Sequence, residues 1–226
     1  MTYLEFLKLL KSYAEQPFAD FQQRLIFTKR EILGVRTPIL RQIAKRYMSN
    51  LDEILSFPNE YYEVVFIKLT QVSQLPYNQF VARLDECVSW MDNWALCDSF
   101  KAKCIRSHKS EFLPILKTMF QRGGEYEQRY PLVVLLSEYV EKDYLAEIEQ
   151  FIMVANTGHY YVYMAVAWLM AEILVKEYEC GVHLLKRRII DVKTCNKAIQ
   201  KATESLRLTK QQKDFLRSLK IENYNE

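Results

Sequence analysis

Glycine and proline are scarce in this chain of 226 residues, which has only five glycines and six prolines. Folds built from β-hairpins need glycine-rich turns, and such turns are almost absent here. Half of the residues are hydrophobic, which is enough to bury a large core. The composition therefore argues against a sheet-based fold and predicts an ordered, all-α protein.

The motifs of the common nucleotide-binding enzymes and hydrolases are also missing. The sequence contains no Walker loop, no GxGxxG and no GxSxG. Its three histidines, His108, His159 and His183, are isolated and show neither HExxH nor Cys/His spacing. We therefore expect no metal, no nucleotide and no other cofactor.

The cysteines form no CxxC pair, and their number is odd. They are Cys87, Cys97, Cys104, Cys180 and Cys195. Most occupy apolar helical positions, which favours reduced thiols in a cytosolic protein over disulfides or a zinc site. No secretory leader opens the chain, and its longest apolar run, residues 160–170, is too short to cross a bilayer. We expect a soluble, cytoplasmic monomer that does not bind membranes.

Charge is distributed unevenly, although the formal net charge is only +3. In residues 24–46 the basic side chains are opposed only by Glu31, and residues 183–220 are again strongly basic. Residues 125–150, which lie between them, are acidic. Two basic ends around an acidic middle fit a cradle for a polyanion, but solvated helix faces alone can produce the same runs.

A helical period of 32 to 35 residues runs through the chain from Asn59 onward. First helices are expected to begin near Asn59, Asn93, Glu125, His159 and Thr194. Second helices are expected to begin near Pro76, Lys109, Asp143, Gly181 and Thr209. Helix pairs of this length cannot bury their own faces and must stack. We therefore predict a HEAT-like α-solenoid of stacked antiparallel helix pairs. It is expected to be a single domain, 1–226, with N-terminal helices in 1–58 and repeats in 59–226.

Three elements are expected ahead of the repeats. The first is a helix over residues 3–13. Its buried side is expected to be formed by Leu4, Leu7, Leu10 and Tyr13. The second is a short element that follows Pro17 and carries Phe18, Phe21, Leu25 and Phe27. The third is a helix that begins near residue 37, where Gly34 supplies a positive φ, Thr37 acts as N-cap and Pro38 occupies the first helical position.

Residues 90–100 contain an unusual combination of side chains. Asp92 or Asn93 is a good N-cap, so a helix is expected to begin here and to run to about Ile105. Its core side is expected to carry Leu96, Phe100 and Cys104. Trp94 and Asp98 then lie on the other side of the helix.

A tryptophan beside a carboxylate can be interpreted in two ways. The pair suits recognition of a flat, electron-poor or cationic group. Alternatively, a second layer of helices covers Trp94, and Asp98 only pairs with Lys101 at i+3.

Arg129 and Trp168 are candidates from later repeats. Arg129 shares a helical face with apolar residues, where its guanidinium must pair with Glu125 or Glu127, snorkel, or hold a phosphate. Trp168 lies in a helix that is apolar nearly all round, which favours a core position. Three tyrosines lie close to Trp168 in the sequence, and they either line a groove or only pack against other residues. They are Tyr160, Tyr161 and Tyr163. Stacked repeats would bring Trp94, Asp98, Arg129 and Trp168 together.

Four parts of the chain share the residues and the order of a known family. They are the segment 34–46, the block 93–100, Arg129 ahead of Leu132-Val133, and Ala165-Val166-Ala167-Trp168. Together they resemble the DNA alkylation repair HEAT-like family, the AlkD-type alkylpurine DNA glycosylases, over most of the chain.

The resemblance implies a right-handed solenoid whose concave basic surface holds duplex DNA and which excises cationic N3- or N7-alkylated purines. Asp98 matches the carboxylate that stabilises the oxocarbenium-like sugar and positions water. Trp94 and Trp168 match the aromatics that cradle the backbone and sugar of the lesion, and Arg129 matches the arginine that holds a phosphate. Further DNA contacts are expected from Arg41, Lys45, Arg187 and Arg188.

Two departures from the family pattern leave other functions open. Met164 and Ala171 stand where excising members carry basic residues. Residues 18–33 are closer to a branch that lacks a short N-terminal element used to engage damaged DNA. The alternatives are a noncatalytic DNA-binding module for damaged or branched DNA and a scaffold for protein partners.

Overall fold

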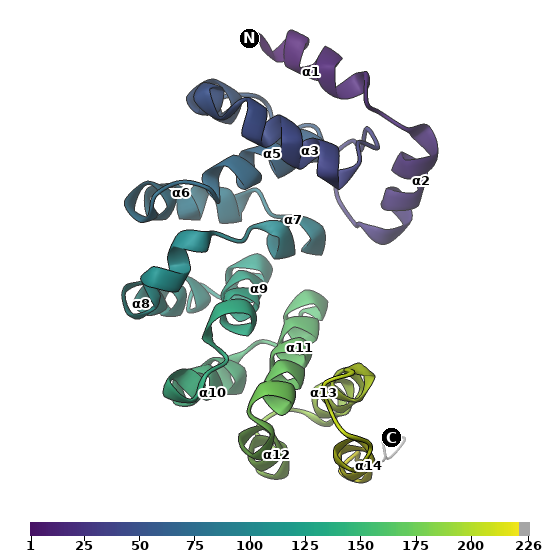
Figure 1. Ribbon diagram of the computed structural model, residues 1–226, viewed down its shortest axis with the longest axis vertical. Coiled ribbons are helices and arrows are strands. Elements are labelled where there is room, and N and C mark those ends of the chain that lie inside the picture. The colour runs from purple at the N-terminus through teal and green to yellow at the C-terminus, as the bar shows by residue number, and fades with distance from the viewer. Residues whose placement is uncertain (222–226) are drawn as a thin grey trace. The chain divides into compact units, whose positions relative to one another are not determined.

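The computed structural model describes residues 1–221, and this part of the chain is built from fourteen α-helices and a few short 3₁₀ and π turns (Figure 1). Its only β-type pairing is an isolated bridge between Glu31 and Tyr61. The all-α prediction is confirmed. The chain divides into two compact units, Met1–His108 and Lys109–Glu226. The single domain 1–226 stays a prediction, and its residues 222–226 lie outside the described part.

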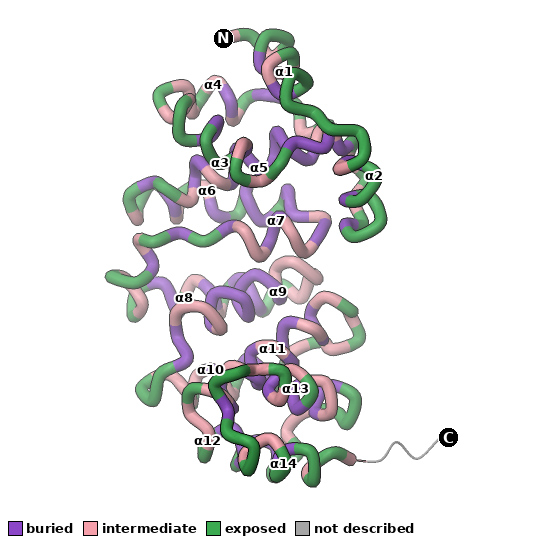
Figure 2. The backbone as a smooth tube through the Cα atoms, turned by 45° about the vertical axis from the view of Figure 1, so that its right-hand side comes forward, coloured by how far each residue is buried: buried purple, intermediate pink, exposed green. Residues whose placement is uncertain are grey.

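The first unit contains seven α-helices. They are α1 (Tyr3–Lys11), α2 (Gln16–Leu25), α3 (Thr37–Arg46), α4 (Leu51–Leu55), α5 (Tyr62–Val72), α6 (Tyr77–Ser89) and α7 (Trp94–Ser99). Helix α5 lies between α3 and α7 and contacts both (Figure 1). Nearly all of its residues are buried because it is apolar around most of its circumference. By contrast, α1 and α2 are largely exposed (Figure 2).

The second unit also contains seven α-helices in its described residues, 109–221. They are α8 (Lys109–Phe120), α9 (Glu125–Val134), α10 (Leu145–Val154), α11 (Tyr160–Lys176), α12 (Tyr178–Lys186), α13 (Val192–Glu204) and α14 (Lys210–Ser218). Helix α11 is the centre of this unit and contacts α9, α12 and α13 (Figure 1).

The predicted repeat is confirmed. The first helices α5, α7, α9, α11 and α13, and the second helices α6, α8, α10, α12 and α14, all begin within three residues of the positions expected from the sequence. Within each unit the first helices pack in a row, which α3 extends in the first unit: the rows are α3, α5 and α7 in one unit and α9, α11 and α13 in the other. This packing of helix pairs is that of a HEAT-like α-solenoid.

The predicted buried face of α1 is wrong. Leu10 is buried, but Leu4 is 76% exposed and Tyr13 is 40% exposed. The helix instead buries Phe6, whose ring lies 5.4 Å from that of Phe57. Aromatic packing therefore decides which stripe of this leucine-rich helix faces the core.

The start of α3 differs from the prediction by one residue. Gly34 has the expected positive φ of 84°, and an added Cβ there would lie 2.4 Å from the carbonyl oxygen of Glu15. Thr37 is the first helical residue rather than the N-cap, a position that Arg36 occupies. The buried carboxylate of Glu63 accepts hydrogen bonds from the backbone N–H groups of residues 33–35, at 2.8 to 3.3 Å. The loop ahead of α3 is therefore fixed by the neighbouring α5.

Helix α7 is shorter than predicted. It ends at Ser99 rather than near Ile105, and residues Lys103–Ser107 form a separate 3₁₀ turn. Phe100 leaves the helix with φ −79° and ψ 74° and packs its ring 5.5 Å from that of Phe80. The burial of this ring diverts the chain, so Cys104 is only half-buried.

Within residues 1–221, every helix falls short of the length and hydrophobicity that a membrane span requires. All five cysteines are free thiols; Cys87, Cys97 and Cys195 are buried and Cys180 is exposed.

Candidate functional site

A buried N-cap fixes the helix that carries Trp94 and Asp98. The Asn93 side-chain oxygen accepts a hydrogen bond from the backbone N–H of Leu96 at 3.0 Å, and Asn93 is completely buried. Of the two predicted N-caps, Asn93 is therefore the one used. Leu96 faces the core, whereas Trp94 and Asp98 are half-buried. Since residues at i and i+4 share a helical face, the indole and the carboxylate lie one turn apart on the same side of α7.

The indole of Trp94 is partly covered by α2. Its Nε1–H donates a hydrogen bond to the carbonyl oxygen of Leu25, the last residue of α2, at 3.1 Å. The interpretation that other helices cover Trp94 is therefore correct in part. The rest of the residue is not fully covered, because Trp94 is half-buried.

Asp92, which sequence reasoning considered only as a cap, is the centre of a polar network. One carboxylate oxygen accepts from the hydroxyl of Thr28 at 2.7 Å and from the backbone N–H of Lys29 at 3.2 Å. The other oxygen lies 2.6 Å from Nη1 of Arg30 and accepts from Asn93 at 2.8 Å. Asp92 thus links residues 28–30 directly to the N-cap of α7.

Arg30 adds two hydrogen bonds to the network around Asp92. Its Nη2 donates to the carbonyl oxygen of Trp90 at 2.7 Å, and its Nε donates to that of Asn59 at 2.9 Å. No local sequence pattern links Arg30 to Asp92, because the two residues belong to different elements and meet only after folding. The network holds the stretch 90–94 in place and therefore also holds the start of α7.

Two of the predicted DNA-contacting cations of the first unit lie on the outer face of α3. Arg41 and Lys45 are exposed and one turn apart, whereas Leu40, Ile43 and Ala44 of the same helix are buried. Both positive charges are therefore accessible to an anionic partner.

In the second unit, Arg129 and Trp168 lie together. Arg129 is only 1% exposed, and its Nη1 donates a hydrogen bond to the carbonyl oxygen of Tyr161 at 2.6 Å. Its guanidinium carbon lies 5.4 Å from the ring centroid of Trp168 and 5.6 Å from that of Tyr161. The burial excludes the snorkelling alternative for Arg129. Trp168 is half-buried, so it is not the fully enclosed core residue that its apolar helix favoured.

Glu125 and Glu127 were the two acids considered as partners of Arg129. Each of them accepts a hydrogen bond from a backbone N–H group. Glu125 accepts a hydrogen bond from the N–H of Tyr161 at 3.1 Å, and Glu127 accepts one from the N–H of Gly124 at 3.1 Å. Glu125 on α9 therefore holds the first turn of α11 in register with Arg129, which binds the same residue through its carbonyl oxygen.

Arg187 and Arg188 follow α12 and are both exposed. Arg187 forms an ion pair with Glu149 on α10 at 2.6 Å, which neutralises part of its charge. Arg188 adopts a positive φ of 50° in the connection to α13.

The structure therefore brings together Trp94 with Asp98 in the first unit, and Arg129 with Trp168 in the second. The meeting of the two pairs stays a prediction.

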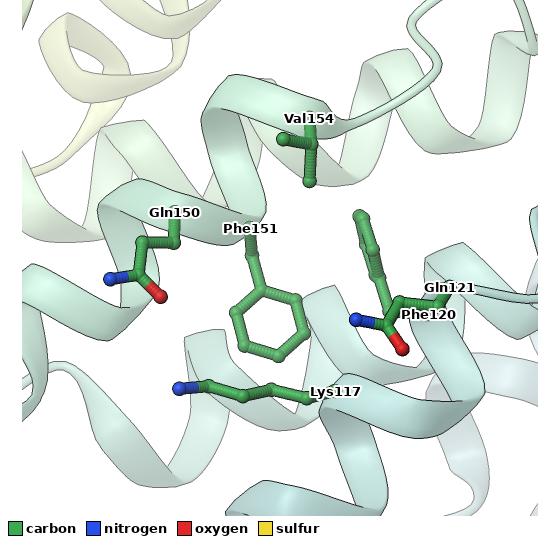
Figure 3. Close-up of a pocket in the computed structure, with 6 residues that line it drawn as sticks. All are labelled: Lys117, Phe120, Gln121, Gln150, Phe151 and Val154. Carbon is green, nitrogen blue, oxygen red and sulfur yellow. The ribbon is translucent and has the colours of Figure 1, made fainter.

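A pocket between α8 and α10 contains none of these residues (Figure 3). It is mostly apolar, and the rings of Phe120 and Phe151 meet in it edge to face at 5.0 Å. Its lining residues are Lys117, Phe120, Gln121, Gln150, Phe151 and Val154. Among residues 1–221, no three histidines, cysteines or carboxylates are grouped closely enough to hold a metal ion.

A family model described as DNA alkylation repair enzyme matches residues 6–179. The matched stretch includes Trp94, Asp98, Arg129 and Trp168 but ends before Arg187 and Arg188. No curated protein is similar enough to the chain to count as a match.

Proposed function

Because the chain belongs to the DNA alkylation repair enzyme family, we propose that it binds duplex DNA and hydrolyses the N-glycosidic bond of purines alkylated at N3 or N7. Asp98 is the catalytic residue of this proposal. The observation that carries it is the half-buried pair of Trp94 and Asp98, presented on one face of α7 by the buried cap Asn93.

The chemistry requires little from the protein beyond this carboxylate. An alkylated purine is cationic, so it departs with the electrons of the C1′–N bond as a neutral base and needs no general acid. Positive charge develops on the sugar as the bond breaks, and a carboxylate nearby stabilises it. Water then adds to C1′, and its proton passes to the carboxylate of Asp98.

The partial burial of Asp98 supports this role. The attraction between two opposite charges grows as the effective dielectric falls, so a half-buried carboxylate stabilises a cationic sugar more strongly than one in bulk water. The rigid cap of α7 also means that the carboxylate need not be repositioned during the reaction.

The aromatic and basic residues would hold the DNA. Trp94 and Trp168 are proposed to contact the sugar and backbone of the lesion. Arg129 is only 1% exposed and lies against Trp168, so its proposed contribution is to orient that indole rather than to hold a phosphate directly. The exposed cations Arg41, Lys45, Arg187 and Arg188 would contact more distant phosphates.

The proposal is tested by incubating the purified protein with methylated duplex DNA and identifying the released bases by chromatography. We expect 7-methylguanine or 3-methyladenine to be released by the wild type, and far less of either base to be released by Asp98→Asn over the same time. Asp85→Asn is the matched control, because it makes the same change at an exposed position on α6. DNA binding without base release by excess wild-type protein would instead support the noncatalytic alternative.

A further inference from the structure

A group of tyrosines at the starts of α9 and α11 is not used by the proposed reaction. The tyrosine ladder, defined as Tyr126, Tyr160, Tyr161 and Tyr163, is held together by ring contacts. The centroid of Tyr161 lies 6.0 Å from that of Tyr126 and 5.5 Å from that of Tyr160. Tyr160 in turn lies 6.1 Å from Tyr163.

Cations are interleaved with these rings. The Nζ of Lys193, at the start of α13, lies 4.5 Å from the centroid of Tyr163. Arg129 lies against Tyr161 and, on its other side, against Trp168. The tyrosine ladder is therefore continuous, through Arg129, with the tryptophan assigned to the DNA site.

Tyr160 is the exposed end of the ladder. It is 62% exposed, although it is the first residue of α11 and two other rings lie beside it. Tyr163 is buried and Tyr161 is half-buried. An exposed aromatic ring supported from behind presents a rigid, flat surface, and little conformational entropy is lost when a second flat group stacks on it.

One exposed cation lies beside the tyrosine ladder. Lys193, whose Nζ contacts the ring of Tyr163, is exposed. The carboxylates of Asp191 and Glu125 accept hydrogen bonds at the starts of α13 and α11: Asp191 accepts from the N–H and hydroxyl of Thr194 at 2.9 and 2.6 Å, and Glu125 accepts from the N–H of Tyr161. An exposed aromatic ring close to an exposed cation suits an unpaired nucleotide, because every base has a π-face and every nucleotide a phosphate.

We infer that Tyr160 is a stacking site for an unpaired nucleobase of the bound DNA, with Lys193 contacting the adjacent phosphate. The inference rests on the proposed binding of duplex DNA and adds that the protein favours duplexes with an unpaired base. Such a base stacks on Tyr160 at low cost, because it has no pairing to lose.

The test compares two duplexes of equal length, one fully paired and one with a single bulged 2-aminopurine. Fluorescence anisotropy measures the affinity for each duplex, and the emission of 2-aminopurine reports stacking of the bulged base. For the wild type we expect about tenfold tighter binding of the bulged duplex, with quenched emission. Tyr160→Ala should abolish both the preference and the quenching and leave the affinity for the paired duplex unchanged. Tyr160→Phe, which keeps the ring, should retain both.

Tyr13→Ala is the matched control, because Tyr13 is also an exposed tyrosine but lies in the first unit, and this variant should behave as the wild type. Equal affinity of the wild type for the two duplexes would overturn the inference and leave the proposed function standing, as would a Tyr160→Ala variant that keeps the preference. Binding to neither duplex would contradict the proposed function itself, and the inference with it.

Discussion

The indole nitrogen of Trp94 donates a hydrogen bond to the carbonyl oxygen of Leu25 at 3.1 Å. This bond joins the helix that carries the proposed catalytic carboxylate to the end of α2. Trp94 and Asp98 lie on the same side of α7, so one side chain connects the N-terminal helices to the candidate site.

Replacing Trp94 by Phe keeps one aromatic ring and removes the hydrogen-bond donor together with part of the fused ring system. Because water can reach the carbonyl oxygen of the half-exposed Leu25, we expect the free energy of unfolding to fall by about 0.5–1 kcal/mol, measured by urea denaturation. Leu25→Ala is the control, since it keeps the backbone acceptor. A Trp94→Phe variant that is as stable as the wild type would show that the bond contributes nothing.

The ion pair between Arg30 and Asp92 should contribute far more than an ordinary surface pair. Both side chains are largely buried and make further hydrogen bonds, so Arg30→Gln or Asp92→Asn alone should destabilise the protein by about 3 kcal/mol. A double-mutant cycle should give a coupling energy of about 1–3 kcal/mol.

The pair Arg83–Asp52 is the matched control for that cycle. Its N–O distance is 3.0 Å, but Asp52 is almost fully exposed, and its coupling should not exceed about 1 kcal/mol. Equal coupling energies for the two pairs would mean that burial does not strengthen the pair of Arg30 with Asp92.

DNA binding through α3 should appear in the salt dependence. If Arg41 and Lys45 each neutralise one phosphate, the slope of log K against log[salt] should fall in magnitude by about 1.8 in the double variant Arg41→Gln, Lys45→Gln. Arg36→Gln is the control, because Arg36 is already paired with Glu15 at 2.8 Å. An unchanged slope in the double variant would favour the scaffold alternative.

Part of this arrangement follows from local sequence and part does not. The repeat helices were predictable because each must bury an apolar stripe, and Asn93 and Gly34 were predictable because a cap and a positive φ need particular residue types. The exposure of Leu4 could not be predicted from the sequence, because the ring contact of Phe6 with Phe57 decides which face of α1 is buried. The link between Arg30 and Asp92 likewise depends on tertiary contacts that no pattern in either segment records.

Lys68 should make the stability of the protein depend on pH. It is buried, donates hydrogen bonds to the carbonyl oxygen of Phe57 and to Asn59, and lies 5.0 Å from the ring of Trp90. Burial lowers its pKa from the ordinary 10.5 to about 8. Between pH 8 and 10.5 the unfolded chain therefore holds a proton that the folded protein lacks, so the contribution of Lys68 to stability rises with pH.

The Lys68→Met variant isolates this effect from other titrating groups. The free energy of unfolding of the wild type minus that of the variant should increase from pH 8 to pH 10.5 by about 1–3 kcal/mol, measured by urea denaturation across that range. A difference that is independent of pH would contradict the lowered pKa of Lys68.

The most direct test of the proposed function is the single-turnover rate at which 7-methylguanine leaves a duplex that contains one such lesion, with enzyme in saturating excess. We predict that Asp98→Asn lowers this rate by about 10²–10³-fold and leaves the affinity for the same duplex unchanged. Equal rates for the wild type and Asp98→Asn would contradict the assignment of Asp98 as the catalytic carboxylate.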